Sequence, residues 1–268
     1  MSNNELNRYS QLIETIFKEN YKNGDVRVEF ERPDLMKKAD ELNIILPKNL
    51  GDVIYSFKYR TALPESITKT APQDKEWVIK NVGRAKYAFV LVNYSRILPD
   101  SLLMEIKIPD STPNIVSKYA LADEQALLTK LRYNRLLDIF TGVACYSLQN
   151  HLRTTVPDVG QVETDEIYVG VDKNGSQYVF PIQAKGGTDE LGIVQIEQDI
   201  LLCENKYPEL LCRAIAAQFI EYNLIAIFEF KTINGEIKKV NEKHYRLVSN
   251  NEISVEEIRQ YNSIRIPD

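Results

Sequence analysis

The stretch VETDEIYVGVDKNGSQYVFPIQAKGG, residues 162–187, decides the fold of the chain around it. Asn174-Gly175 separates two apolar-rich runs, and this dipeptide between such runs predicts a β-hairpin. Gln183 and Lys185 lie near the end of the second predicted strand. Residues two apart on a strand face the same way, so the amide and the ammonium share a face. Carboxylates gather at the start of the first strand: Glu163, Asp165 and Glu166.

The register of this hairpin determines which carboxylate meets Gln183. With a two-residue turn at Asn174-Gly175, Glu166 lies opposite Gln183. With a three-residue loop that places Gly175 at positive φ, the pairing shifts by one residue and Asp165 lies opposite Gln183. Periodicity leaves both registers open. In either case an acid, an amide oxygen and a lysine share one patch, which suits a hard divalent cation and an activated water.

An acid at the start of one strand, followed by a strand that ends in Gln183-Ala184-Lys185, resembles the core of the PD-(D/E)xK nucleases. The glutamine form is similar to a variant found in some restriction endonucleases. The resemblance covers Asp123 to Phe230 and implies a restriction-endonuclease-like α/β core, a mixed central sheet flanked by helices. The chain departs from the family pattern at Thr164, which stands where proline is usual. It departs again at Gln183, which removes one negative charge.

The resemblance implies a metal-dependent DNA endonuclease of the restriction type, with Asp165, Gln183 and Lys185 as its catalytic residues. Lys185 would orient or deprotonate the attacking water while the cation polarises the phosphate. The implied cofactor is Mg²⁺, with Mn²⁺ as a substitute, and a second acid of the hairpin makes up the charge that glutamine lacks. The expected cation ligands are Asp165, Glu163, Glu166, Gln183 and Ala184.

Other acids compete for a place in this site. Asp158 belongs to a literal Pro-Asp pair, but it falls in a predicted turn. A predicted helix opens at Asp123, a good cap, and Glu124 or Asp138 of that helix is a further candidate. Alternatively, these residues form no functional site: the charged side chains are solvated, and Lys185 marks the point where the strand leaves the sheet.

The first part of the chain predicts a winged-helix-like α+β domain, in the order helix, strand, helix, turn, helix and hairpin. The third helix, residues 49–59, would recognise DNA, and the hairpin from Trp77 to Asn93 would be the wing. Val78 to Pro99 contains no acid. The alternative is that the aromatic residues of the third helix only pack a small core. The expected DNA contacts are Lys48, Asn49, Tyr55, Lys58, Arg60, Lys80, Arg84, Lys86 and, on a later helix, Gln195.

Prolines between Pro99 and Pro113 mark the expected domain boundary. Residues 1–112 would form the DNA-recognition domain and residues 113–268 the nuclease domain. After the hairpin, apolar periodicity and capping residues predict four elements. These are helices over Ile193–Cys203 and Leu210–Phe219, a buried strand over Leu224–Lys231, and a last helix capped by Ser254 and Glu257.

The composition is that of a globular protein, since 44% of the 268 residues are hydrophobic and 26% are charged. No apolar run is long enough to span a bilayer, and a signal pattern is absent from the start of the sequence. Three cysteines without metal-type spacing fit a reduced, cytoplasmic protein. With only two histidines, a metal site built from histidines is disfavoured. A net charge of −5 disfavours nonspecific binding to polyanions, although a local basic patch could still bind DNA.

The expected partner is double-stranded DNA. A double-strand break calls for two active sites, so a homodimer is expected. Two other functions stay open. One is a DNA-binding regulator on a nuclease-like scaffold without activity, and the other is a nuclease that acts on RNA, branched DNA or damaged DNA.

Overall fold

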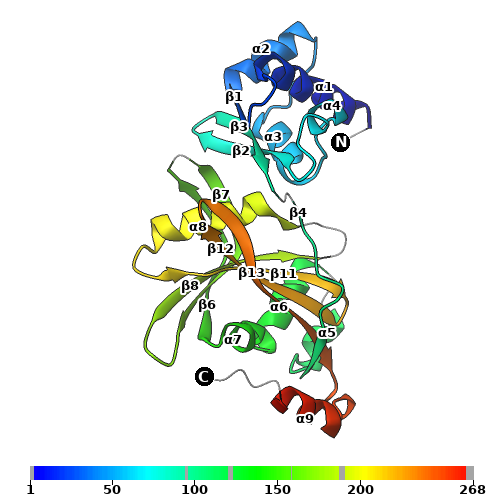
Figure 1. Cartoon of the computed structure of the whole chain (residues 1–268), viewed down its shortest axis with the longest axis vertical. Helices are drawn as coiled ribbons and strands as arrows, with labels where there is room; N and C mark the ends of the chain where they lie inside the picture. The colour runs from blue at the N-terminus through cyan, green and yellow to red at the C-terminus, as the bar shows by residue number, and fades with distance from the viewer. Residues whose placement is uncertain (1–2, 94–95, 120–122, 158, 187–190, 264–268) are drawn as a thin grey trace. The chain divides into compact units, whose positions relative to one another are not determined.

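The computed structural model describes residues 3–93, 96–119, 123–157, 159–186 and 191–263 of the chain. It divides into two compact units (Figure 1). Unit 1 comprises residues 1–97, 154–162 and 192–194. Unit 2 comprises residues 98–153, 163–191 and 195–268. Each unit has its own apolar core.

Unit 1 packs helices against a small antiparallel sheet. Its elements are α1 (Asn3–Asn20), β1 (Arg27–Glu31), α2 (Arg32–Glu41), α3 (Gly51–Tyr59), α4 (Glu65–Thr68), β2 (Glu76–Gly83), β3 (Lys86–Val92) and β4 (Arg96–Ile97). The three-stranded sheet has the order β1-β3-β2. Phe17 of α1 packs edge-on against Trp77 and Phe89 of the sheet, with ring centroids 5.1 and 5.0 Å apart. Helix, strand, helices and hairpin therefore follow one another in the order that the sequence predicts.

Unit 2 is built on an eight-stranded mixed sheet. Its strands are β5 (Glu105–Pro109), β6 (Ala144–Val156), β7 (Gly160–Val171), β8 (Gln177–Lys185), β10 (Leu211–Cys212), β11 (Ala214–Glu221), β12 (Leu224–Ile233) and β13 (Glu236–Val248); β9 is Leu191–Gly192. The order is β5-β13-β12-β11-β8-β7-β6, with β10 also paired to β8. The pairs β8/β11 and β5/β13 are parallel, whereas β7/β8, β11/β12 and β12/β13 are antiparallel.

Helices flank this sheet. They are α5 (Asn114–Tyr119), α6 (Glu124–Tyr133), α7 (Leu136–Thr141), α8 (Ile193–Lys206), the 3₁₀ turn η1 (Asn250–Glu252) and α9 (Val255–Ser263). Ile182 and Ala184 of β8 join the apolar core that α6 and α7 form. Gln183 lies between them in sequence and contacts Asp199 of α8, so α8 covers the opposite face. The expected mixed sheet flanked by helices is confirmed. No helix in the described part of the chain is long and apolar enough to cross a membrane.

Two expectations about local structure are wrong. Leu210–Phe219 is not a helix, because β10 and β11 occupy this stretch. Its alanines favour a helix locally, but β11 lies between β8 and β12, where Ala214–Ala217 is buried and small side chains fit. The single helix expected after Asp123 is instead two, because Arg135 adopts φ +48° and separates α6 from α7.

The prolines after Pro99 do not separate β5 from the large sheet. β5 pairs with β13, and Pro109 lies opposite Val248 at its end. β5 is an edge strand, where a residue without an N–H group is tolerated. Unit 2 therefore begins at Leu98, whereas the sequence placed the boundary after residue 112.

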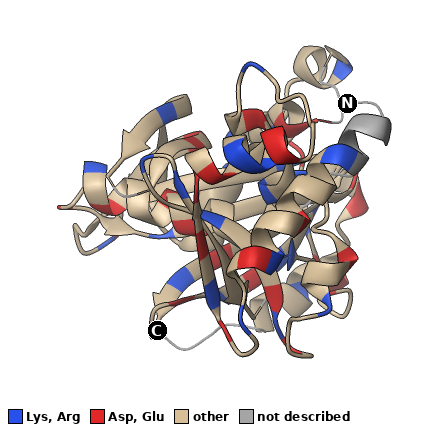
Figure 2. Cartoon of the chain, turned by 90° about the horizontal axis from the view of Figure 1, so that it is seen from above, with Lys and Arg blue, Asp and Glu red and all other residues tan. Residues whose placement is uncertain are grey.

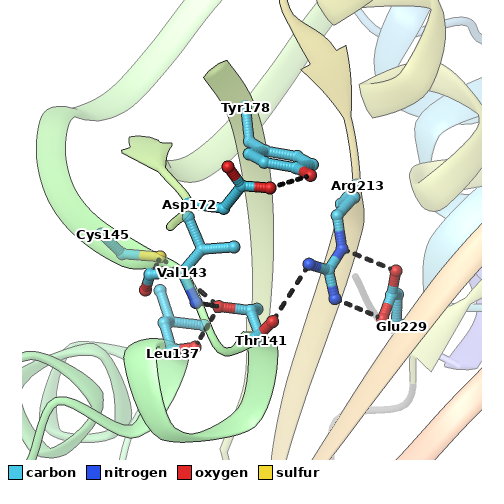
Figure 3. Close-up of polar contacts among 8 residues, drawn as sticks. All are labelled: Leu137, Thr141, Val143, Cys145, Asp172, Tyr178, Arg213 and Glu229. Carbon is cyan, nitrogen blue, oxygen red and sulfur yellow. Dashed lines mark hydrogen bonds and ion pairs between the residues drawn. The ribbon is translucent and has the colours of Figure 1, made fainter. Parts of the chain in front are cut away.

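The loop between β7 and β8 is held by Asp172. Its Oδ1 accepts hydrogen bonds from the N–H groups of Asn174 and Ser176, both at 2.9 Å. Its Oδ2 accepts a hydrogen bond from the Tyr178 hydroxyl at 3.0 Å (Figure 3). Gly175 has φ +84°, and Val171 lies opposite Gln177. The strands are therefore joined through a wider loop than the two-residue turn.

An ion pair between a half-buried arginine and a buried glutamate joins the residue before β11 to β12. The Arg213 guanidinium donates from Nε and Nη2 to the two carboxylate oxygens of Glu229, both at 2.8 Å (Figure 3). It also donates to the Thr141 carbonyl at 3.2 Å and lies over the rings of Tyr178 and Phe180. Both carboxylate oxygens of Glu229 therefore accept hydrogen bonds from Arg213, which fits a structural role for this ion pair.

Candidate functional site

The observed register brings Asp165, not Glu166, to the lysine end of the hairpin. Glu166 lies opposite Ile182, which is the pairing expected for the three-residue loop. Beyond this pair, side chains continue the contact between the strands. The Asp165 carboxylate accepts a hydrogen bond from the Ala184 N–H at 2.8 Å, and the Thr164 hydroxyl donates to the Ile182 carbonyl at 3.3 Å.

Asp165 is a carboxyl group in a poorly solvated position. Burial raises its pKa, and the hydrogen bond from the Ala184 N–H opposes that rise. The charges of Glu124 and Lys185 also act on it, in opposite directions. A positive charge beside such a poorly solvated carboxylate stabilises its ionised form.

Lys185 is fixed by an acid from α6. Its Nζ lies 2.6 Å from Glu124 Oε1, and its side chain is 13% exposed. Asp123 caps α6 by accepting a hydrogen bond from the Ala126 N–H, so Glu124 lies in the first turn as expected. The strand passes close to this turn because Gly186 has no side chain. A Cβ on Gly186 would lie 2.8 Å from the Asp123 carbonyl carbon.

Gln183 is joined to Asp199 of α8. The amide Nε2 donates to Asp199 Oδ2 at 2.9 Å and to the Glu163 carbonyl at 3.3 Å. Asp199 is 1% exposed, and its Oδ1 is buried without a hydrogen-bond partner among the described residues. Burial raises the pKa of Asp199 well above its usual range, the Gln183 amide and the Thr164 hydroxyl oppose that rise, and the charge of Asp165 adds to it. The buried Asp199 and the half-buried Asp165 therefore lie within electrostatic range of each other.

The other two acids of the hairpin lie outside this group, which corrects the expectation that one of them completes the site. Glu166 is fully buried on the α6 face, where the Arg132 guanidinium donates to it at 2.8 Å and Ser147 adds a hydrogen bond. The Glu163 side chain is 43% exposed and pairs with Arg153 at 2.6 Å. Each of these acids already has a cationic partner.

The remaining acids proposed from the sequence are placed as follows. Asp138 accepts hydrogen bonds from Arg135 and from the Cys145 N–H, so it fixes the turn after α7. Asp158 lies outside the described residues. Gln195 is half-buried on α8, one turn before Asp199. None of these contacts brings the Asp138 carboxylate to Lys185.

Sequence reasoning missed His151. This residue of β6 adopts φ +46°, a conformation that non-glycine residues rarely take and that often marks a functional position. Its Nε2 lies 3.0 Å from the Gln125 amide, beside the glutamate that holds Lys185. His151 is also one of the groups that lower the pKa of Asp165. No pattern in the sequence signals a positive φ in the middle of a strand.

In unit 1, aromatic and basic side chains meet on α3. The Tyr55 and Tyr59 rings pack edge-on with centroids 4.9 Å apart. The Arg60 guanidinium lies 5.1 Å from the Tyr55 ring, and Lys58 Nζ lies 4.9 Å from the Tyr59 ring. Tyr55 is 46% exposed, so it does not serve only to pack a core. Lys58 also donates to Asn81 of β2 at 3.3 Å.

The other expected DNA contacts of unit 1 differ in their surroundings. Asn49 is exposed and bonded to Asp52 and to the Gly51 N–H, so it supports the start of α3. Lys86 pairs with Glu31 at 3.1 Å. Acidic and basic residues are interspersed along the chain (Figure 2). Three residues lie at the surface or partly so: Lys48, Lys80 and Arg84.

Among the described residues, no group of three or more histidine, cysteine, aspartate or glutamate side chains could hold a metal ion. A cation at the end of the hairpin would therefore need amide or main-chain oxygens beside its carboxylates. Comparison of the chain with family models, curated proteins and solved structures found no match.

Proposed function

We propose that this chain is a metal-dependent endonuclease that hydrolyses phosphodiester bonds in duplex DNA. One observation carries the proposal: the β7–β8 hairpin brings Asp165, Gln183 and Lys185 to the same end of the sheet. Unit 2 would be a restriction-endonuclease-like core. Unit 1 would be a winged-helix-like module, which its β1-β3-β2 sheet and the exposed tyrosine and basic residues of α3 support.

The residues at this end of the hairpin fit a hard divalent cation. Asp165 offers a carboxylate oxygen and Gln183 and Ala184 offer amide and carbonyl oxygens, which Mg²⁺ and Mn²⁺ prefer. The buried Asp199 Oδ1 without a partner is a further free oxygen. A bound cation would polarise a phosphoryl oxygen and stabilise the charge on the departing 3′ oxygen.

The chain's own contribution centres on Lys185. Glu124 holds the ammonium in place at 2.6 Å, so its position is set before substrate arrives. In that position it can orient a water for attack on phosphorus and offset negative charge that develops on the phosphorane. A base of the site takes the proton of that water. No covalent bond between protein and substrate is required.

The proposal is tested by incubating the full chain with supercoiled plasmid DNA, with Mg²⁺ or with EDTA. We expect nicked and linear products only with Mg²⁺, and Lys185→Ala should lower the cleavage rate at least about 100-fold. Lys173→Ala, which removes an exposed lysine from the loop of the same hairpin, is the matched control and should cleave normally. Equal rates for both variants would remove Lys185 from the mechanism.

The same experiment separates the other functions. Gel-shift binding to duplex DNA without cleavage in Mg²⁺ or Mn²⁺ would favour an inactive DNA-binding regulator. Preferred cleavage of RNA, branched DNA or damaged DNA would keep the chemistry but change the substrate. A double-strand break in one encounter would call for two copies of the site, and sedimentation of the protein with DNA would reveal the homodimer.

A further inference from the structure

The glutamine of the hairpin leaves a nuclease-type site short of one negative charge. Glu163 and Glu166 do not supply it, because each is paired with an arginine. Only Asp165 among the hairpin acids has a carboxylate at the lysine end of β8. The missing charge must therefore come from another element if a divalent cation is to bind firmly.

Asp199 of α8 has the properties of that second carboxylate. It is 1% exposed, and the Gln183 amide fixes one of its oxygens at 2.9 Å. The other oxygen, Oδ1, is buried and has no hydrogen-bond partner among the described residues. Leaving such an oxygen unmatched is costly, and a cation bound to it would remove that cost.

The position of Asp199 also accounts for the glutamine. An acid at position 183 would lie 2.9 Å from the Asp199 carboxylate, and two buried like charges that close repel strongly. An amide at this position avoids the repulsion and donates a hydrogen bond that orients Asp199. In this arrangement the strand carries the amide and the helix carries the acid.

We propose that Asp199 is the second carboxylate ligand of a divalent cation bound with Asp165, and that Gln183 positions Asp199 for this role. The ligand class is a small, hard cation such as Mg²⁺ or Mn²⁺, because both ligands are carboxylate oxygens. The inference shares its site with the proposed nuclease, but cation binding is measured without any substrate.

The test is the binding of Mn²⁺ to the full-length, metal-free protein, followed by isothermal titration calorimetry and by the electron paramagnetic resonance signal of free Mn²⁺. We expect Asp199→Asn to weaken binding by more than about 100-fold, the upper end of the loss when only an outer contact is removed. Glu204→Gln removes an exposed acid from the same helix and should bind like the native chain.

The decisive variant exchanges the two groups. Gln183→Glu combined with Asp199→Asn keeps an amide and a carboxylate in contact but reverses their positions. We expect this double variant to recover Mn²⁺ affinity to within about tenfold of the native value, because the charge of the ligand set is restored. Urea denaturation of each variant shows whether it is folded. The double variant retains the hydrogen bond, so it still tests the proposal if Asp199→Asn does not fold.

Three outcomes would overturn the inference. The first is native-like Mn²⁺ affinity in Asp199→Asn. The second is a folded double variant that does not bind Mn²⁺. The third is a native chain that binds no Mn²⁺ at all. A native chain that binds Mn²⁺ through Asp199 but cleaves no nucleic acid would refute the nuclease proposal and leave the cation site standing.

Discussion

Replacing Gly186 by alanine should damage the candidate site more than it damages the fold. The Cβ of the new residue would lie 2.8 and 2.9 Å from the carbonyl carbon and Cα of Asp123, and 3.0 Å from the Glu124 nitrogen. Carbon atoms pack at roughly 3.5–4.0 Å. All three neighbours are main-chain atoms, so no side chain can rotate away. The end of β8 and the first turn of α6 must move apart by about half an ångström or more.

This displacement acts on the contact that positions Lys185. Glu124 lies in the turn that moves, and its carboxylate holds the ammonium at 2.6 Å. Overpacking of this kind costs about 1–3 kcal/mol of the free energy of unfolding. A misplacement of about 1 Å costs about 100-fold in rate, so half of that displacement should lower DNA cleavage about tenfold.

Gly170→Ala is the matched control. Its Cβ would lie 2.7 Å from Val143 Cγ1 and 2.9 Å from the Ala144 carbonyl oxygen, so the steric cost is similar. Gly170 lies opposite Tyr178, towards the loop end of the hairpin and away from Lys185. Urea denaturation and plasmid cleavage are measured for both variants. We expect both variants to lose similar stability but only Gly186→Ala to lose cleavage activity. An equal loss of cleavage in both variants would refute the geometric reasoning.

Two further predictions concern stability. Arg213→Ala should lower the free energy of unfolding by about 3–5 kcal/mol, because it leaves the buried Glu229 carboxylate without its partner; urea denaturation measures this, and a loss below 1 kcal/mol would contradict it. The pKa of Asp199 is raised in the folded state, so folding favours the protonated carboxyl group. Protonated Asp199 therefore contributes fully to stability below about pH 4, the usual pKa of an unfolded aspartate. This contribution is lost as the pH rises through the folded-state pKa. In EDTA, Asp199→Asn should therefore be more stable than the native chain at pH 7 and equal to it near pH 3.5. A constant difference across that range would exclude a raised pKa.

The sequence was sufficient for those features that depend on neighbouring residues. Asn174-Gly175 between two apolar-rich runs predicts the hairpin, and the cap at Asp123 predicts the start of α6. The expected shared face of Gln183 and Lys185 is not evident in their contacts, because Gln183 bonds Asp199 of α8 and Lys185 pairs with Glu124 of α6. The register was open because it depends on the loop. Asp172 decides it by binding two N–H groups of the loop and the Tyr178 hydroxyl, a set of contacts that no periodicity reveals.

Long-range packing explains the expectations that failed. Ala214–Ala217 has helical propensity, but its place between two strands selects an extended chain. Glu166 is spaced correctly for the site, yet the register turns it towards α6, where Arg132 pairs with it. In both cases the local pattern was compatible with two structures, and a partner distant in sequence selected one of them.

Packing of a distant helix also explains why residue 183 is a glutamine. In the sequence, Asp199 follows Gln195 by four residues on a predicted helix, and nothing in that spacing decides whether its carboxylate faces the sheet or solvent. Packing α8 on the sheet instead buries its carboxylate against Gln183, at 2.9 Å. In an apolar surrounding, a second acid in place of Gln183 would be repelled by Asp199, and an apolar residue would leave Asp199 Oδ2 without a donor as well. The amide is the side chain that tolerates this neighbour, so the residue that weakens the strand motif is the one that the helix requires.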